Sequence, residues 1–319
     1  MNVVHTISEL SSEDLQNGSC VTIGNFDGVH LGHQALLHQT KERARELRLA
    51  SIVVTFEPHP LRVIRGQTPP FITLIDQKMR LLSAIGLDHT VCLSFTREMA
   101  GLSPEEFVQL YLVQGLKTKA LIIGHDYVFG KDKRGNYDLL KELGQRHGFV
   151  VEKIDPIYKN GDVVSSTRIR TLVQAGHVEE VRPLLGRYYQ VSGTVIEGHK
   201  RGGPVLGIPT ANLKLVDELF PQPGVYAVWA EWEDEILPAV ANVGHNPTFG
   251  NDALSVEVHI LDFDRDLYGA QVRVNFVKHI RPEQKFSGIE ELKAQIFKDI
   301  AVAREMLSDP ETFIYTCKA

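Results

Sequence analysis

The sequence predicts two folded parts of different class. The first is an α/β domain with a Rossmann-like, mostly parallel sheet, and the second is an antiparallel β-barrel or sandwich with a terminal helix. Three observations support this. β-rich runs alternate with helical patterns up to about residue 176, strands without intervening helices follow past about residue 187, and 319 residues are many for one core. We therefore expect one domain over residues 1–186 and another over residues 187–319.

The elements of the first part follow each other in a regular order. Expected strands cover residues 20–23, 51–56, 90–93, 120–123 and 149–151. Helical spacing covers residues 30–49, 78–85, 104–116 and 137–147. This alternation is typical of a parallel sheet with helices on both faces, whose ligand sites lie in the turns after the strand carboxyl ends.

The second part contains runs of alternating polarity separated by turn residues. Expected strands cover residues 189–196, 225–231, 236–243, 254–261 and 271–276. Residues 287–307 carry apolar side chains at helical spacing, so we expect a last helix that covers one side or end of the barrel or sandwich.

Composition narrows the class of protein. The chain has 34 basic and 40 acidic residues, a formal charge of -6, which disfavours a nucleic-acid partner. The first residues lack a leader pattern and no uncharged stretch is long enough to span a bilayer, so we expect a cytoplasmic protein with no membrane partner. Cys20, Cys92 and Cys317 form no paired spacing, which suggests neither a disulfide framework nor a zinc site. The oligomeric state is not indicated.

The turn after the first expected strand reads GNFDGVHLGH at residues 24–33. Three glycines allow a sharp turn and a close approach to a ligand, and the following helix directs its free N–H groups and positive end outward. His30 and His33 are three residues apart, hence on one face, where two imidazoles can hold the oxygens of a triphosphate. The turn predicts a nucleotidyltransferase site. Its candidate binding residues are Gly24, Phe26, Asp27, Gly28 and Gly32. The alternatives are exposed helix-start histidines or a zinc site, which lacks a third ligand at suitable spacing.

A second set of polar residues, SSTRIR, opens the helix that runs from residue 165 towards residue 176. Ser166 and Thr167 with Arg170 one turn later fit either plain helix capping or a phosphate clamp. The histidine turn favours the clamp, because phosphoryl chemistry without a protein nucleophile needs groups on two sides of the phosphates.

The run GHDYVFGKD at residues 124–132 resembles a P-loop but has five residues between its glycines and an Asp in place of Ser or Thr. As the turn after an expected strand it still lies on the functional edge of the sheet. Asp126 there is either a substrate contact or a solvated turn residue.

The barrel part carries a glycine-rich basic segment at residues 198–212. Gly198, Gly203 and Gly207 either wrap phosphates or shape a hairpin. Thr210 and Asn212 offer oxygen atoms that suit a magnesium nucleotide and share a face if the segment is extended. Glu257 shares its strand phase with Ser255 and His259. If that face lines the barrel interior, the carboxylate is available as a base, whereas a solvent-facing polar strand fits the pattern equally.

Together these motifs resemble the prokaryotic bifunctional riboflavin kinase/FAD synthetases over nearly the whole chain. The resemblance rests on GNFDGVHLGH at 24–33, TFEPHP at 55–60, GHDYVFG at 124–130, SSTRIR at 165–170, PTAN at 209–212, NVGHNPTF at 242–249 and DFDRDLYG at 262–269. Two departures are a loop at residues 203–207 about one residue longer than usual and Val258, where the family often has Thr.

The resemblance implies an N-terminal module that moves AMP from ATP to FMN, giving FAD and pyrophosphate, and a C-terminal module that phosphorylates riboflavin to FMN. Both steps would use Mg²⁺ and ATP. His30 and His33 would stabilise the triphosphate, clamped by Ser166, Thr167 and Arg170, and Asp126 would lie near the flavin phosphate or metal.

The same resemblance gives roles to the barrel residues. Thr210 and Asn212 would hold magnesium and nucleotide phosphates, and Glu257 would activate the ribityl hydroxyl. No covalent enzyme intermediate is implied. Three other readings stay open: an adenylyltransferase for another phosphorylated precursor, a flavin sensor or store, and a class I aminoacyl-tRNA synthetase relative, for which we find no lysine-rich second motif.

Overall fold

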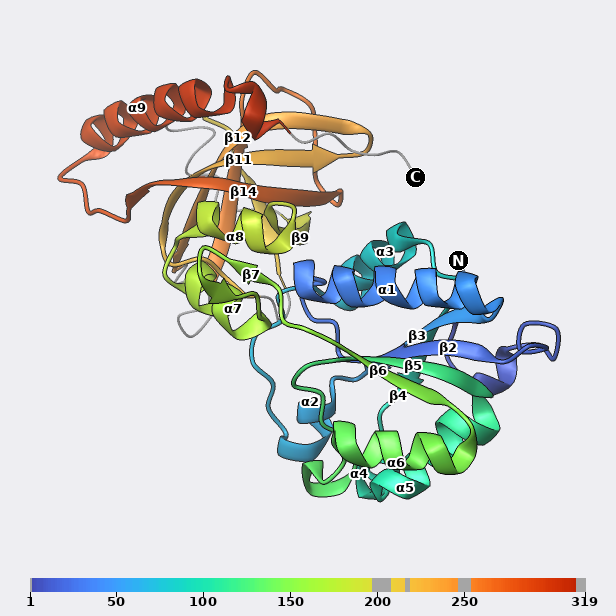
Figure 1. The fold of residues 1–319 in the computed structure, drawn as a ribbon. Coiled ribbons are helices and arrows are strands. Elements are labelled where there is room, and N and C mark those ends of the chain that lie inside the picture. Colours follow the sequence, from blue (N-terminus) through green and yellow to red (C-terminus); the bar gives the residue numbers. More distant parts are fainter. Residues whose placement is uncertain (1, 197–207, 216–218, 246–253, 314–319) are drawn as a thin grey trace. The chain divides into compact units, whose positions relative to one another are not determined.

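The structure, a computed structural model, describes residues 2–196, 208–215, 219–245 and 254–313 (Figure 1). By their packing the residues divide into two compact units, Met1–Pro69 with Leu74–Ser165, and Pro70–Thr73 with Ser166–Ala319. Helices α7 (Ser166–Gln174) and α8 (Val178–Leu185) thus belong with the barrel, because α8 packs on its strands. The expected boundary between residues 186 and 187 falls inside the second unit, directly before the first barrel strand.

The first unit is built on a six-stranded sheet in the order β1-β4-β3-β2-β5-β6, with every neighbouring pair parallel. Its strands are β1 (Asn2–Val4), β2 (Ser19–Ile23), β3 (Ala50–Glu57), β4 (His89–Ser94), β5 (Thr118–Gly124) and β6 (Val150–Ile154). The five expected strands and their parallel pairing are confirmed. The edge strand β1 was not predicted.

Helices cover both faces of this sheet (Figure 1). Helices α1 (Leu31–Leu47) and α3 (Ile75–Ile85) lie on one face, and α4 (Arg97–Gly101), α5 (Pro104–Phe107) and α6 (Tyr137–His147) on the other. Strand β3 serves both layers, since Val53 packs with the α1 side and Ile52 with the α6 side. The expected helix over residues 104–116 is instead α5 followed by a π-helical stretch, Val108–Gly115.

Several short elements lie between the main strands and helices of the first unit in the sequence. They are the short helices η1 (Ile7–Glu9), α2 (Pro60–Arg65) and η3 (Lys131–Lys133) and the hairpin of β7 (Tyr158–Lys159) and β8 (Asp162–Val163).

The strand order indicates where a ligand would bind in the first unit. The chain leaves β2 for β3 on one side and later returns to β5 on the other side of β2. In open α/β sheets, ligands bind beyond the strand carboxyl ends where the order reverses in this way. The turn after β2 and the turn after β5 both lie at this point.

The second unit is a closed antiparallel barrel with the order β10-β13-β12-β11-β14-β9, which decides between the barrel and the sandwich. Its strands are β9 (Tyr189–Ile196), β10 (Ala211–Lys214), β11 (Gly224–Trp232), β12 (Glu235–His245), β13 (Leu254–Ile260) and β14 (Gln271–Pro282). Strand β10 was not among the expected strands.

Helix α9 (Ile289–Leu307) covers one side of the barrel, along β11 and β12 (Figure 1), and a short helix η6 (Pro310–Thr312) follows it. Ala303 and Leu307 of α9 pack with Trp229 and Val240, which marks that face of the strands as the outer one. The alternate residues fill the interior, among them the fully buried Tyr189, Tyr226 and Phe276.

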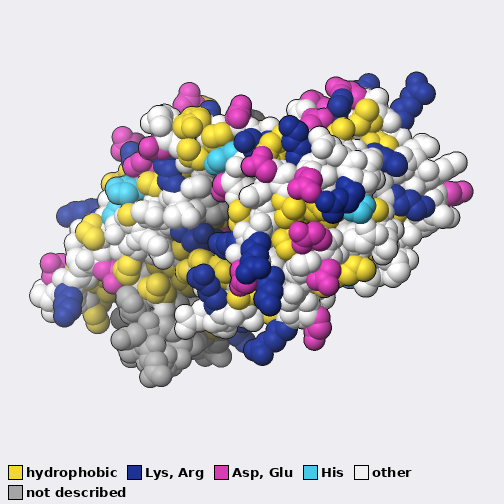
Figure 2. Space-filling view, turned by 60° about the horizontal axis from the view of Figure 1, so that its bottom comes forward, with side chains coloured by type: hydrophobic (Ala, Val, Ile, Leu, Met, Phe, Trp, Pro, Cys, Tyr) yellow, Lys and Arg dark blue, Asp and Glu magenta, His cyan; other side chains and the backbone are white. Residues whose placement is uncertain are grey.

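On the face shown in Figure 2, basic and acidic side chains are interspersed and hydrophobic side chains form small separate groups. Among the described helices, none combines the length and apolar character that crossing a membrane requires.

Candidate active sites

The turn between β2 and α1 has an unusual backbone. Phe26 and Val29 have φ angles of +50° and +38°, and Gly28 has +86°. Non-glycine residues adopt this region rarely and only where their surroundings fix them. A Cβ on Gly24 would lie 3.2 Å from the Phe26 ring, and one on Gly32 would lie 3.1 Å from the His30 ring. Both glycines therefore make room for aromatic rings of the turn itself.

The structure brings the two histidines together at the start of α1. His30 is the N-cap residue, and its Nδ1 accepts a hydrogen bond of 3.3 Å from the backbone N–H of His33. The two imidazole rings stack with their centroids 3.7 Å apart. Phe26 packs edge-on against His33 at 5.2 Å. His30 is buried, 6 % exposed, so the alternative of an exposed helix-start residue does not describe it.

The surroundings of His33 favour its neutral form. Burial lowers the pKa of His33 well below its ordinary value, and the neighbouring His30 and Lys78 lower it further. Its Nδ1 is buried and makes no hydrogen bond to any described residue. A buried polar atom without a partner is costly, and such atoms mark places where a ligand or water binds.

Two residues that hold this turn were not predicted from the sequence. Lys78 of α3 donates through Nζ to the carbonyl oxygen of Asn25 at 3.3 Å, and the Thr55 hydroxyl of β3 donates to the same oxygen at 3.4 Å. One signal was present in the sequence. Lys78 lies three residues after Ile75 and four before Leu82, on the apolar face of an amphipathic helix where a lysine is unusual.

The two candidate aspartates of this unit differ in burial. Asp27 is buried in the turn, whereas the Asp126 side chain is 83 % exposed, with its carboxylate 3.9 Å from His125 Nδ1. Asp126 follows β5, next to β2 in the sheet, so it lies at the same edge as the histidine turn. The expected position of Asp126 at the carboxyl edge is thus confirmed, and its role stays a prediction.

Ser166, Thr167 and Arg170 form the first turns of α7 in the second unit. Arg170 Nε donates to the carbonyl oxygen of Pro70 at 2.9 Å, within that same unit. In the first unit, the carbonyl of Val164 lies 3.7 Å from the place of a Cβ on Gly32. The chain therefore passes the histidine turn shortly before α7 begins.

The barrel places three polar residues in one row. Asn212 of β10 is paired with Glu257 of β13, which is paired in turn with Asn242 of β12. Directly opposed residues of antiparallel strands point to the same face. Asn242 and Val240 are two residues apart on β12, so their side chains point to the same face of the strand. Val240 packs with residues of α9, which covers the outside of the barrel. The row of Asn212, Glu257 and Asn242 therefore lies on the outer face.

This outer position decides between the two alternatives left open for the face of Glu257. The face of Glu257 does not line the barrel interior, because its neighbours Val256 and Val258 fill that interior and alternate with it. The departure at Val258 therefore lies on the face opposite to Glu257. Asn242 had been noted only as part of a motif, and its place beside Glu257 becomes visible only from the strand register.

The segment before β10 is tied to this row. His259, on the same face as Glu257, contacts the carbonyl oxygen of Pro209 through Nδ1 at 2.8 Å. Thr210 is exposed, whereas Asn212 is buried at 8 %. Gly198, Gly203 and Gly207 lie outside the described residues.

The donor set in this row suits a hard cation. The side chains of Asn212 and Glu257 supply oxygen atoms, and Mg²⁺ takes one or two protein oxygens while keeping waters and substrate phosphates as its other ligands. Among the described residues, no group of three or more His, Cys, Asp or Glu side chains is arranged to hold a metal.

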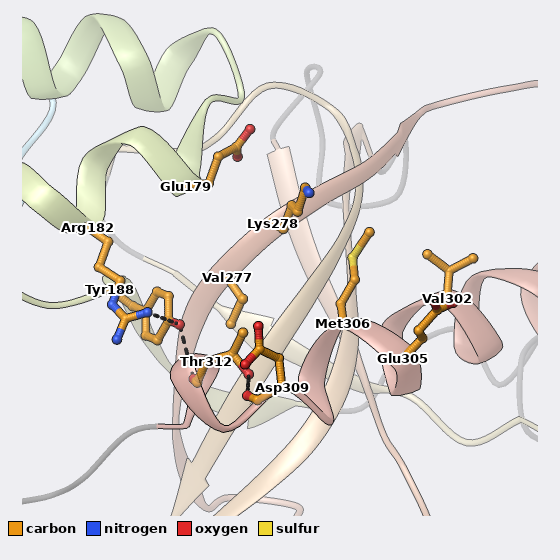
Figure 3. Close-up of a pocket in the computed structure, with 10 residues that line it drawn as sticks. All are labelled: Glu179, Arg182, Tyr188, Val277, Lys278, Val302, Glu305, Met306, Asp309 and Thr312. Atoms are coloured by element: carbon orange, nitrogen blue, oxygen red, sulfur yellow. Dashed lines mark hydrogen bonds between the residues drawn. The ribbon is translucent and has the colours of Figure 1, made fainter. Parts of the chain in front are cut away.

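A cavity of about 510 Å³ lies elsewhere in the second unit, between α8, β14 and α9 (Figure 3). Arg182 donates to the Tyr188 hydroxyl at 2.8 Å, which donates to the Thr312 carbonyl at 3.1 Å. The lining mixes these with acids, Lys278 and apolar side chains, and includes none of the candidate residues. We assign no catalytic role to it.

Comparison with known proteins agrees with this arrangement. Residues 12–168 match the family described as FAD synthetase, and residues 185–307 match the family described as riboflavin kinase. The bifunctional riboflavin kinase/FMN adenylyltransferase of Pseudomonas fluorescens is 39 % identical, covering 96 % of this chain and 98 % of the relative. The protein of the same name from Escherichia coli K12 is 38 % identical, covering 96 % and 97 %.

A solved structure has the same fold over nearly the same length. It is described as a macrolide-efflux protein from Streptococcus pneumoniae and matches with a TM-score of 0.83 and 31 % identity, covering 95 % of this chain and 98 % of that one. That description differs from the names of the sequence relatives, although both extend over almost the entire chain. On the identity and coverage of these relatives, the chain belongs to the family of bifunctional riboflavin kinase/FMN adenylyltransferases.

Proposed function

We propose that this chain makes FAD in two steps at two separate sites. The barrel unit phosphorylates riboflavin to FMN with ATP, and the α/β unit joins FMN to the AMP part of a second ATP, releasing pyrophosphate. The observation that carries the proposal is the stacked His30–His33 pair, which lies where the strand order of the parallel sheet reverses. The two halves of the chain match the two enzyme families.

In the adenylyl step, a phosphate oxygen of FMN attacks the α-phosphorus of ATP while the bond to the bridging oxygen breaks, so pyrophosphate leaves. Negative charge shifts onto the leaving phosphates. Preorganised N–H donors at that place stabilise the transition state, and the start of α1 with its two histidines supplies them. Because His30 Nδ1 accepts from the backbone, a neutral His30 carries its proton on Nε2 and donates from there.

The other first-site assignments rest on position along the sequence. Ser166, Thr167 and Arg170 would clamp the phosphates, and Asp126 at the β5 turn would contact the flavin phosphate or its metal.

In the kinase step, Glu257 takes the proton from the ribityl hydroxyl as that oxygen attacks the γ-phosphorus, and ADP leaves. Asn212 and Thr210 would hold Mg²⁺, which neutralises phosphate charge when it is bound, with Gly198, Gly203 and Gly207 wrapping the nucleotide. The pairing of Glu257 with Asn212 supports this, because it puts a base next to a metal and phosphate ligand. ATP as the co-substrate of both steps suits a cytoplasmic location.

The experiment compares Glu257→Gln with Glu290→Gln, an exposed acid in the first turn of α9. We expect Glu257→Gln to lower FMN formation from riboflavin by about 10²- to 10⁴-fold, the usual contribution of a general base, and to leave FAD formation from supplied FMN unchanged. Glu290→Gln should change neither rate. If Glu257→Gln kept its kinase rate, the assignment of the base would be wrong. Turnover of another phosphate ester in place of FMN would favour a different adenylyltransferase.

A further inference from the structure

We propose that Lys78 is a positioning residue for adenylyl transfer, whose ammonium group holds the Asn25 carbonyl and so fixes the turn that presents His30 and His33. The inference rests on the proposed function of that turn. None of the motifs that mark the family contains this residue.

The placement of Lys78 is not that of an ordinary surface lysine. Lys78 is only 6 % exposed, and lysine is almost never buried to this extent unless it has a partner. Its Nζ donates to the Asn25 carbonyl oxygen at 3.3 Å, inside the turn itself. The partner of this buried ammonium group is therefore the backbone of the histidine turn.

The turn needs such a contact because its backbone is strained. Phe26, directly after Asn25, and Val29, later in the same turn, have positive φ angles, a conformation that persists only where the surroundings determine it. Thr55 from β3 and Lys78 from α3 approach one oxygen from two elements and anchor the residue where the turn begins. The Phe26 ring, which packs against His33 and over Gly24, keeps its place by the same anchor.

Lys78 also acts on His33 through its charge. Burial lowers the pKa of Lys78, while the nearby Cys92, Glu57 and Asp27 act in the opposite direction. The positive charge of Lys78 in turn helps to lower the pKa of His33, together with burial and His30. Lys78 thus contacts the backbone of the turn and also favours the neutral form of His33.

The test uses the full chain with Lys78→Met, which keeps length and burial but removes donor and charge, and Lys78→Gln, which keeps a donor without charge. Lys41→Met is the matched control, since Lys41 is an exposed lysine of the same unit that donates to the Ile85 carbonyl at 2.9 Å. FAD formation from FMN and magnesium ATP is followed against pH. Riboflavin phosphorylation by the same molecules reports whether the barrel unit is folded, and the NMR spectrum reports whether the first unit is folded.

We expect Lys78→Met to lower kcat for FAD formation by about 10- to 100-fold, the loss that a misplacement of about 1 Å causes, with KM changed less than kcat. The His33 imidazole, followed by NMR, should titrate at higher pH in both Lys78 variants, and Lys78→Gln should recover part of kcat. Lys41→Met should behave as the unchanged protein.

Unchanged kcat and unchanged His33 titration in Lys78→Met would overturn the proposal. A loss of kcat that comes with loss of the folded first unit, or without a shift of the His33 titration, would reduce Lys78 to a structural residue and overturn it as well. If the unchanged protein made no FAD at all, the proposed function would fail. The NMR titration would still test the link between Lys78 and His33.

Discussion

Replacing Gly32 by alanine tests whether the histidine arrangement itself sets the rate of FAD formation. The added Cβ would lie 3.1 Å from Cε1 and 3.2 Å from Nδ1 of His30, so the imidazole must move by a few tenths of an ångström. That movement weakens the 3.3 Å contact to the His33 N–H and the 3.7 Å ring stack. We expect kcat for FAD formation to fall by about 10- to 100-fold, or roughly 1.4 to 2.7 kcal/mol of transition-state stabilisation.

The effect of Gly32→Ala on stability should have the opposite sign. Gly32 lies in the first turn of α1 without a positive φ angle, and alanine favours a helix over glycine by up to about 1 kcal/mol. We therefore expect a thermal midpoint that is equal or slightly higher together with a slower enzyme.

The assay measures FAD by chromatography from FMN and magnesium ATP, with riboflavin phosphorylation as the internal reference. Gly101→Ala is the control, because a Cβ there meets nothing within 4 Å and Gly101 also lies in a helix of the first unit. An unchanged kcat in Gly32→Ala would refute the reasoning. A slow variant that is also unfolded would remove the evidence for a positional effect.

Three further predictions concern stability and reactivity. Because the pKa of His33 is lowered in the folded state, the folded chain binds fewer protons than the unfolded chain below about pH 6.5, so the free energy of unfolding should fall as pH drops below that value and fall less steeply in His33→Gln. Burial raises the pKa of the Cys20 thiol to about 12, so peptide mapping after alkylation of the native protein at pH 8 should find Cys20 unmodified, and rapid modification would contradict its burial. Asp299 is 3 % exposed and accepts from Arg281 at 2.9 and 3.0 Å, so Asp299→Ala should lower the stability of the second unit by about 3 to 5 kcal/mol in urea unfolding, whereas Asp262→Ala, which removes the exposed pair with Arg304, should change it little.

Much of the first site could be predicted from a short stretch of sequence. Glycines, histidines and the helix start fall within ten consecutive residues, so spacing alone predicts that His30 and His33 share one face at the strand edge. Strand alternation likewise predicts the parallel sheet and the antiparallel part, because both patterns are read within short windows.

Features that depend on contacts between distant parts of the chain could not be predicted from the spacing of residues in the sequence. Period two indicates that Ser255, Glu257 and His259 share a face, but which face is outside depends on the packing of α9 on β11 and β12. Strand β10 has four residues and follows a segment rich in glycine and proline, so its apolar pattern is too short to recognise. Lys78 was missed for a related reason, since its partner Asn25 lies 53 residues away in the sequence.

The time course of products from riboflavin and magnesium ATP tests the central claim most directly. With the unchanged protein, we predict that FMN appears first and is then converted to FAD with release of pyrophosphate. With His33→Ala, FMN should accumulate at an unchanged rate while FAD formation is lost. Absence of both products, or FAD formed by His33→Ala at the original rate, would contradict the account of two sites in one chain.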